Sequence, residues 1–441
     1  MSRTAPSVHK AKQGEKPGLR QRWSWVEASI WTDRMLTALE NGVKGGKWFS
    51  LIDKVHSLRT LNVAWQQVAA NSGAAGVDKV SIQRFERDAG KYLEELSSDL
   101  RMGNYTPQPV KRVHIPKGGG KTRPLGIPTV RDRIVQTALK MALEPVFENE
   151  FHPNSFGFRP GRGCKDALRV VDHKLTEGNT WVVDADLSSY FDTIPHEALL
   201  RRVGEKVSDG KVLELIQVFL SQKIMEGMES WSPGSGSPQG AVISPLLANI
   251  YLHELDVLVN KAGYMMVRYA DDFVILCQSR EEAENALELV RKWVDQNGLS
   301  LHPDKTQLGD ASKPGEGFVF LGYRFEAGRR YVCKKSMKSL QDRIRKKTKR
   351  SCGQSLESII SELNPMLRGW FEYFKHAYKR TFPQIDGFVR RRLRCILRRY
   401  RKKSKGTGRN LGDQKRWPNT FFAELGLFTM KEAHVLACQS R

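Results

Sequence analysis

Two apolar runs separated by a short acidic segment constrain the fold of this chain more than any other feature. Residues 264–279 read YMMVRYADDFVILCQS, and only YADD interrupts the apolar pattern. This pattern is typical of a β-hairpin, with Asp271 and Asp272 at its tip. Adjacent carboxylates repel each other unless a cation lies between them. An ordinary turn remains the alternative, because Asp is a frequent turn residue and the tetrapeptide alone is weak evidence.

A second acidic motif lies about 85 residues earlier, in a similar context. In WVVDADLSSYFDTIP, Asp186 follows an apolar strand, and the segment SPQGAVISPLLANIYL lies between the two motifs. Three carboxylates that converge at strand ends form an oxygen-rich site suited to Mg²⁺. Two such ions about 3.5–4 Å apart can hold the attacking and leaving oxygens of an in-line phosphoryl displacement. The pattern therefore favours phosphoryl transfer.

The charge is concentrated in one part of the chain. The 441 residues include 72 Lys and Arg and 48 Asp and Glu, a net charge of +24. Residues 321–441 hold 31 of the basic and 9 of the acidic residues, a net charge of +22. A charge block on one domain indicates a polyanionic partner, most often nucleic acid. The alternative, a solvated basic helix face, is less plausible for a whole domain.

The remaining patterns indicate a mixed α and β chain. Residues 46–102 and 131–148 have helical periodicity, and residues 109–130 alternate around a GGG tip, which predicts a β-hairpin. From Trp181 onward strands and helices alternate, residues 316–335 resemble a final hairpin, and everything after residue 336 is expected to be helical, with a fresh helix start at Pro365. The chain contains no stretch of about 18 apolar residues, the length that a membrane span requires. The six cysteines contain no CxxC pair and are typical of reduced thiols in a cytosolic protein.

Taken together, these motifs resemble the palm motifs of the reverse transcriptases. PKGGGKTRPLGIPTVRDRIVQTAL and NSFGFRPGRGCKDAL are similar to the fingers of the group II intron-encoded proteins, GLSLHPDKTQ and FVFLGYRF to the segments after the catalytic hairpin, and LNPMLRGWFEYFKHA and RWPNTFFAELGLF to the thumb, or X domain, of bacterial maturases. The resemblance covers roughly residues 50–435.

The resemblance implies a role for each matching residue. Asp186, Asp271 and Asp272 would be catalytic and would ligate two Mg²⁺ ions, for which Mn²⁺ can substitute, together with Leu187. Phe191 would stand under the sugar and exclude a 2′-hydroxyl, unless it is only a core residue. The other residues expected to contact the nucleotide are Lys121, Arg123, Gln239, Gly240 and Lys305. The residues expected to contact nucleic acid are Arg390, Arg391, Arg394, Arg398, Arg399 and Lys402, which flank an apolar stripe on one basic helix.

The implied fold is α+β: a right-hand polymerase with an antiparallel palm sheet, followed by an all-α basic thumb. We expect a basic flexible N-terminal extension over residues 1–45, fingers over 46–180, a palm over 181–335 and a thumb, or maturase domain, over 336–441. We expect no endonuclease domain, because the chain lacks the paired cysteines of a His-Asn-His nuclease.

The leading hypothesis is an RNA-directed DNA polymerase that also binds group II intron RNA and assists splicing and intron mobility. Its expected partners are that RNA, an RNA template with a DNA primer, dNTPs and target DNA, with no membrane, in the bacterial cytoplasm at the nucleoid. Two alternatives remain open. One is a domesticated relative acting in DNA repair or defence, and the other is a non-enzymatic RNA-binding splicing cofactor. The intact carboxylates and SPQG segment argue against the cofactor.

Overall fold

A computed structural model describes residues 18–118, 120–349, 351, 353–400 and 411–439. These residues form two compact units. The first unit comprises Met1–Gly163, Asp186–Asp272 and Leu287–Pro303, and the second comprises Cys164–Ala185, Phe273–Ala286 and Asp304–Arg441. The three expected catalytic carboxylates all belong to the first unit. The basic C-terminal helices belong to the second.

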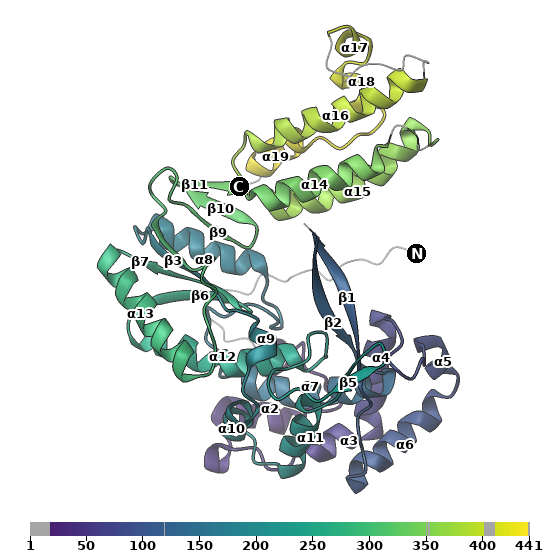
Figure 1. Cartoon of the computed structure of the whole chain (residues 1–441), viewed down its shortest axis with the longest axis vertical. Coiled ribbons are helices and arrows are strands. Elements are labelled where there is room, and N and C mark those ends of the chain that lie inside the picture. The colour runs from purple at the N-terminus through teal and green to yellow at the C-terminus, as the bar shows by residue number, and fades with distance from the viewer. Residues whose placement is uncertain (1–17, 119, 350, 352, 401–410, 440–441) are drawn as a thin grey trace. The chain divides into compact units, whose positions relative to one another are not determined.

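The first unit is mainly helical (Figure 1). Its helices are α1 (Leu19–Arg22), α2 (Asp33–Asn41), α3 (Ile52–His56), α4 (Leu58–Asn71), α5 (Ile82–Arg87), α6 (Ala89–Met102), α7 (Val130–Glu148), α9 (Tyr190–Thr193), α10 (His196–Gly204), α11 (Gly210–Leu220) and α12 (Ser244–Lys261), with a 3₁₀ turn, η1, at Lys44–Gly46. The centre of its core is α7, most of whose side chains are buried and which packs against α3, α4 and α12. The cap of α7 is Thr129, whose hydroxyl accepts a hydrogen bond from the Asp132 N–H.

The N-terminal segment corrects one expectation. Residues 18–45 are folded, although the sequence predicted a flexible extension to residue 45. Trp31 is 0% exposed, and its indole nitrogen donates to the Met141 carbonyl on α7 at 3.0 Å. Leu36 of α2 is also fully buried. The free energy gained by burying these apolar side chains orders the segment, although its basic and polar composition had predicted flexibility. The rest of the expected extension lies outside the described residues.

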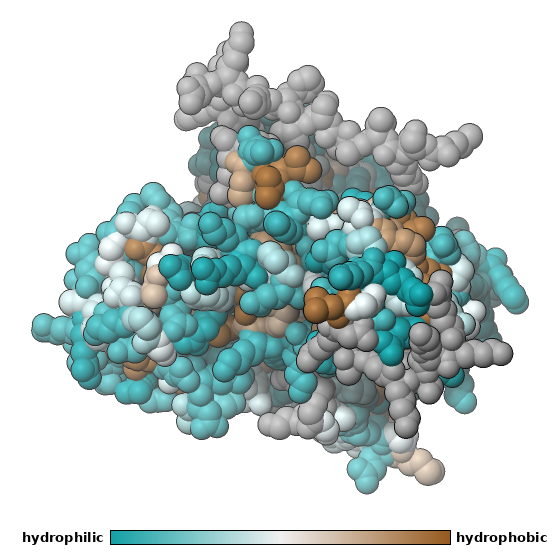
Figure 2. Space-filling model, turned by 90° about the horizontal axis from the view of Figure 1, so that it is seen from above, coloured by the Kyte–Doolittle hydropathy of each residue, from teal (hydrophilic) through white to brown (hydrophobic). Residues whose placement is uncertain are grey.

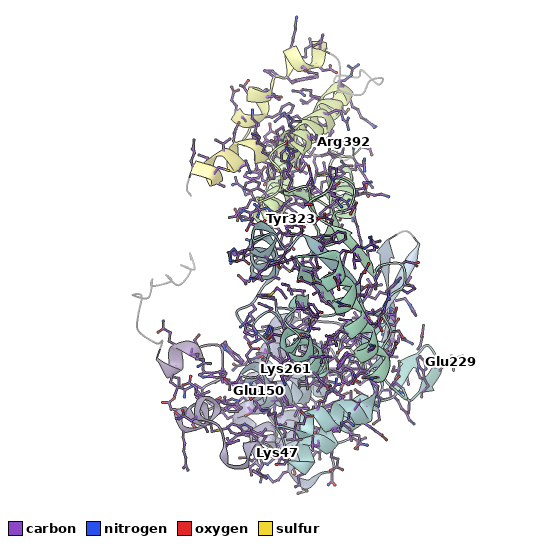
Figure 3. The ribbon with its side chains drawn as sticks, turned by 90° about the vertical axis from the view of Figure 1, so that its left-hand side faces the viewer. Lys47, Glu150, Glu229, Lys261, Tyr323 and Arg392 are labelled. Carbon is purple, nitrogen blue, oxygen red and sulfur yellow. The ribbon has the colours of Figure 1, made fainter. Side chains whose placement is uncertain are left out.

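The predicted basic hairpin is present in the first unit. Strands β1 (Val110–Gly118) and β2 (Lys121–Ile127) pair antiparallel, from Lys111 opposite Ile127 to Gly118 opposite Lys121. The sequence did not reveal that two short strands, β4 (Ile224–Glu226) and β5 (Glu229–Trp231), extend this sheet, in the order β2-β1-β4-β5. Glu229 of β5 is labelled in Figure 3. The extension holds the segment before SPQG beside the basic hairpin.

A second four-stranded sheet has the order β6-β7-β3-β8. Its strands are β3 (Trp181–Asp186), β6 (Met265–Tyr269), β7 (Asp272–Cys277) and β8 (Gln307–Asp310). Strands β3 and β8 pair antiparallel, with Trp181 opposite Asp310. The helix α13 (Arg280–Gln296) follows β7, in keeping with the predicted alternation of strands and helices. All three predicted palm strands, β3, β6 and β7, are therefore present, and β8 is an addition.

The second unit combines a small sheet with a helical domain. Residues 316–335 form three strands rather than one hairpin: β9 (Phe318–Phe320), β10 (Tyr323–Glu326) and β11 (Arg329–Val332), in the order β11-β10-β9. Tyr323, labelled in Figure 3, begins the central strand. The helices wholly within the unit are α8 (Cys164–Thr176), α14 (Lys334–Lys347), α15 (Leu356–Phe374), α16 (Thr381–Tyr400), α17 (Leu411–Arg416), α18 (Asn419–Glu424) and α19 (Met430–Gln439). Helices α14 and α15 lie side by side, and α16 packs against α19 (Figure 1).

Helix α15 continues through Pro365, where the sequence predicted a new helix start. A proline inside a helix costs about 3 kcal/mol. The apolar face of α15 compensates, because Leu363, Leu367 and Trp370 are buried on both sides of the proline. Asn364, the residue before the proline, bridges to a distant loop: its amide donates to the Gly426 carbonyl, and its oxygen accepts from the Phe428 N–H, both at 2.8 Å.

The surface carries little apolar area on the face drawn in Figure 2, where described residues are mostly hydrophilic and apolar patches are small and separate. Among the described residues, no helix has both the length and the apolar character that crossing a bilayer requires. The described cysteines are free thiols.

Candidate active site

The acidic hairpin has the predicted form, with its acidic pair at the tip. Strand β6 ends at Tyr269, and β7 begins at Asp272. Between them Ala270 has a left-handed backbone, with φ of +60°. That region is unfavourable for a residue with a Cβ, and it persists only where the surroundings enforce it. The turn that presents Asp271 and Asp272 is therefore held in place by its neighbours.

The side chain of Arg268 provides much of that support. It is fully buried, and its guanidinium binds both oxygens of the buried carboxylate of Asp256 on α12, at 2.8 and 2.5 Å. Its remaining terminal nitrogen donates to the Asn249 side chain and to the Ala270 carbonyl, each at 2.9 Å. Burial alone lowers the pKa of Arg268, but the charge of Asp256 raises it above the ordinary value. The arginine therefore stays charged and fixes the turn to α12.

A loop from much earlier in the chain contacts the same turn. The Arg268 N–H donates to the Asn154 carbonyl, and the Phe156 N–H donates to the Arg268 carbonyl, both at 2.9 Å. Gly157 follows, and a Cβ at that position would lie 2.3 Å from the Ala270 nitrogen. The Asn249 amide also donates to the Gly157 carbonyl at 2.8 Å. Only glycine permits this approach of two backbones.

The strand that carries Asp186 is stabilised by residues 300–302. The Ser188 N–H donates to the Ser300 carbonyl, and the His302 N–H donates to the Asp186 carbonyl, both at 2.8 Å. Leu187 therefore faces Leu301 in a non-hydrogen-bonded pair. In such a pair the N–H and C=O of both residues point away from the partner strand. The Leu187 carbonyl is directed away from Leu301.

Tyr190 and the strand order relate the two acidic motifs to each other. Tyr190, four residues after Asp186, is buried, and its hydroxyl donates to the Ala248 carbonyl at 2.6 Å. Burial raises the pKa of Tyr190 well above its usual value, and the negative charge of Asp271 contributes to the increase. The segment after Asp186 therefore lies within electrostatic range of the hairpin tip. In the strand order, β3 and β7 are also neighbours.

The oxygen ligands available here suit a hard cation such as Mg²⁺. Asp186, Asp271 and Asp272 supply carboxylates, and Leu187 supplies a carbonyl. In the part of the chain that the structure describes, no three His, Cys, Asp or Glu side chains lie close enough together to share one ion. The fit to a divalent cation therefore rests on the chemistry of the donors and on their positions at the ends of β3 and β7.

The expected nucleotide-binding residues of the fingers and of SPQG are linked by hydrogen bonds. The Arg123 guanidinium on β2 donates to the Gln239 oxygen at 2.9 Å, and the Gln239 amide donates to Asp192 at 3.1 Å. The Gly126 N–H also donates to the Gln239 carbonyl at 2.6 Å. A Cβ at Gly240, whose φ is +108°, would lie 2.4 Å from the Gly126 carbonyl oxygen. This close contact fixes the SPQG loop against the basic hairpin.

Phe191 lies beside an open pocket of about 320 Å³ and is only partly buried. The pocket is lined by Arg112, Phe191, Asp192, Ile224, Trp231 and residues 232–238. Two contacts position the phenylalanine backbone: the Ser237 N–H donates to its carbonyl at 2.6 Å, and a Cβ at Gly236 would lie 2.7 Å from the same oxygen. Phe191 is therefore not simply a core residue.

The structure says less about the two lysines that were expected to contact the nucleotide. Lys121 begins β2, and its side chain lies outside the described part of the structure. Lys305 is exposed in the turn before β8 and belongs to the second unit.

The basic helix α16 departs from its expected organisation. Arg394, expected to contact nucleic acid, is 7% exposed, and its guanidinium donates to the Trp417 carbonyl and the Asn419 side chain, at 3.0 and 3.1 Å. Arg398 forms an ion pair of 2.7 Å with Asp413. Both arginines therefore fasten residues 413–419 to α16. The periodicity could not reveal this, because the partner segment is far along the chain.

The other arginines of α16 are more exposed to solvent. Arg399 is exposed, and Arg390 and Arg391 are partly exposed. Arg392, labelled in Figure 3, donates to the hydroxyl and carbonyl of Thr348. Lys402 lies outside the described residues. A nucleic-acid role remains a prediction for the more exposed arginines.

Sequence reasoning missed the residues that support the hairpin, although one signal was visible. Arg268 is a lone charged residue inside the apolar run MMVRY, and a charge in a buried strand requires a partner. Its partners Asp256 and Asn249 lie on α12. Nothing in the local sequence indicates which residues of that helix face the strand.

Comparisons with known proteins agree with this arrangement. Residues 115–325 match the family model "Reverse transcriptase (RNA-dependent DNA polymerase)", and residues 337–417 match "Group II intron, maturase-specific domain". Protein YkfC of Escherichia coli (strain K12) is 36% identical over 56% of this chain and 75% of the relative. The group II intron-encoded protein LtrA of Lactococcus lactis subsp. cremoris is 29% identical over 78% of this chain and 73% of the relative.

A solved chain of a partial Cas6-RT-Cas1–Cas2 complex is 23% identical, with a TM-score of 0.37, and covers 56% of this chain and 41% of that chain.

The two domain matches lie in the order that the sequence predicted, with the polymerase domain first. The chain therefore belongs to the family of group II intron-encoded reverse transcriptases and maturases, which combine RNA-directed DNA synthesis with a role in intron splicing and mobility.

Proposed function

We propose that this reverse transcriptase extends a DNA primer on an RNA template by nucleotidyl transfer at Asp186, Asp271 and Asp272. The observation that carries the proposal is that β3, which ends at Asp186, and β7, which begins at Asp272, are neighbours in one sheet. Within the proposal, these carboxylates and the Leu187 carbonyl hold two Mg²⁺ ions, for which Mn²⁺ can substitute. When bound, the ions stabilise the charge on the attacking and leaving oxygens of the displacement.

The protein's own residues position the reactants, which is the larger part of catalysis in phosphoryl transfer. Arg123, held by Gln239, and Lys121 on the same strand bind the triphosphate of the incoming dNTP. Lys305 is a further candidate for that contact. Phe191 faces the pocket beside Asp192 and stands where a ribose 2′-hydroxyl would project.

The basic second unit binds nucleic acid backbone in this proposal. Its partners are the group II intron RNA, the template–primer duplex and the target DNA, so the protein acts at the nucleoid. Arginine is suited to this role because its planar fork binds phosphate bidentately. The exposed candidates are Arg399 and, in part, Arg390 and Arg391.

Substitution Asp271→Asn tests the catalytic assignment. The amide is nearly isosteric but removes one charge from the proposed metal site, so primer extension on an RNA template with Mg²⁺ should be abolished while RNA affinity stays within about twofold. The matched control is Asp88→Asn, at an exposed carboxylate in the first unit. Extension by Asp271→Asn within about tenfold of the wild type, a barrier change of about 1.4 kcal/mol, would contradict the assignment.

A further inference from the structure

We propose that Phe158 contacts the primer-terminal base pair of the bound RNA–DNA duplex and holds it at the catalytic hairpin. The proposal rests on the proposed placement of the catalytic carboxylates at Asp271 and Asp272. It adds a substrate contact from a loop to which the site above assigns no substrate.

The backbone of Phe158 is strained, and its side chain is exposed. Its φ is +59°, in the left-handed region that residues with a Cβ avoid, and 51% of its surface is exposed. Strain of this kind persists only where neighbouring contacts enforce it, and it is concentrated at functional sites. An exposed phenylalanine ring also forgoes the stabilisation that burial would give. Folding alone therefore does not explain why an exposed phenylalanine occupies this strained position.

The residues on both sides of Phe158 enforce its conformation. Before it, Gly157 packs against the Tyr269–Ala270 peptide and accepts a hydrogen bond from Asn249. After it, the side chain of Arg159 is 2% exposed and binds both carboxylate oxygens of Glu148, at 2.7 and 2.9 Å. The same guanidinium donates to the His152 and Ser155 carbonyls, each at 2.7 Å. Phe158 is thus the outward-facing residue between two rigid anchors.

The position of those anchors identifies the ligand. Gly157 touches the Tyr269–Ala270 peptide, which lies one residue before Asp271, and consecutive Cα atoms are about 3.8 Å apart, so Phe158 directly follows the residue that contacts the hairpin turn. The nucleic acid that is extended at Asp271 must bring its reacting end to this tip. An uncharged aromatic ring suits the faces of bases and sugars rather than phosphates, and it accepts every base because each has a π-face. A primer terminus of any sequence therefore fits.

The test measures binding without catalysis, on two labelled RNA–DNA duplexes of one sequence. One duplex ends in a recessed DNA 3′ terminus, and the other has both ends closed by loops. In fluorescence anisotropy, Phe158→Gly and Phe158→Ala should bind the recessed duplex about tenfold more weakly, the loss expected for one base–aromatic contact, and the closed duplex within about twofold of the wild type. Phe158→Tyr should bind both as the wild type does. Phe49→Ala, at a phenylalanine that is 65% exposed elsewhere in the first unit, should change neither.

Thermal melting separates this role from a structural one. Glycine adopts a left-handed backbone without strain, so the Tm of Phe158→Gly should equal or exceed that of the wild type. An unchanged affinity of that variant for the recessed duplex would overturn the proposal, as would equal losses on both duplexes. The readout is also independent of the metal assignment. If Asp271→Asn retained polymerisation, the carboxylate assignment would fail, and anisotropy would still report whether Phe158 contacts a primer terminus.

Discussion

Gly157 can pack directly against the acidic hairpin because it has no side chain. Its Cα faces the Ala270 nitrogen so closely that an added methyl group must displace the hairpin tip. We predict that Gly157→Ala lowers kcat of primer extension about 100-fold, the loss expected when a reacting group moves by about 1 Å. Gly161→Ala is the control, because Gly161 lies in the same loop with φ of +67° but has open space around it. Equal kcat values for the two variants would exclude a positioning role for Gly157.

A second prediction at the residue scale concerns Phe191. Phe191→Val should raise ribonucleotide incorporation, because removing the ring opens the pocket beside Asp192. The measurement is the ratio of kcat/KM for dNTP to kcat/KM for the matching NTP, which should fall at least tenfold. Retained activity with an unchanged ratio would mean that the ring does not meet the sugar. Ile224→Ala, at another wall of the pocket, is the control for pocket volume alone.

At the scale of elements, β6 is joined to α12 by the buried Arg268–Asp256 pair. Removing one member leaves an unpaired buried charge, so Arg268→Met should lower the free energy of unfolding by about 3–5 kcal/mol. The double variant Arg268→Met with Asp256→Leu should recover most of that loss but little polymerisation, because the Ala270 carbonyl still lacks its donor. Denaturant unfolding and primer extension distinguish the two effects. Arg280→Met, at an exposed ion pair, should cost under about 1 kcal/mol.

The sequence predicted the elements with strong periodicity and missed those defined by contacts. The long helix α12, the basic hairpin and the acidic hairpin were predicted because each has a clear apolar pattern. Strands β4 and β5 have three residues each, too few to show a period. Helix α15 passes through Pro365 because burial on both sides outweighs the local cost. The acidic motifs stand out in the sequence because of their strand context, and their catalytic role stays a prediction, whereas Arg268 and Gly157 make contacts with tertiary partners that no local pattern identifies.

At the scale of the whole molecule, net charge overstates the surface available to phosphate. Arg394 and Arg398 count toward the basic block, yet they bind protein groups. We predict that changing Arg390, Arg391 and Arg399 together to Gln reduces the slope of log K against log salt for RNA binding by about two to three units. Arg394→Gln should instead lower Tm and change the slope by less than one unit. An unchanged slope in the triple variant would assign these arginines to a solvated face.

The pairing of β3 has a consequence for the nascent chain. Asp186 and Leu187 are synthesised more than 100 residues before Leu301 and the β8 strand, which complete their edge of the sheet. Until those residues leave the ribosome, this strand edge keeps unpaired backbone groups, a template for pairing with other chains. A transcript truncated before codon 310 therefore encodes a polypeptide that contains all three proposed catalytic carboxylates and still exposes a strand edge with unpaired backbone groups. Selection against premature termination should be strongest in the interval between the acidic hairpin and β8.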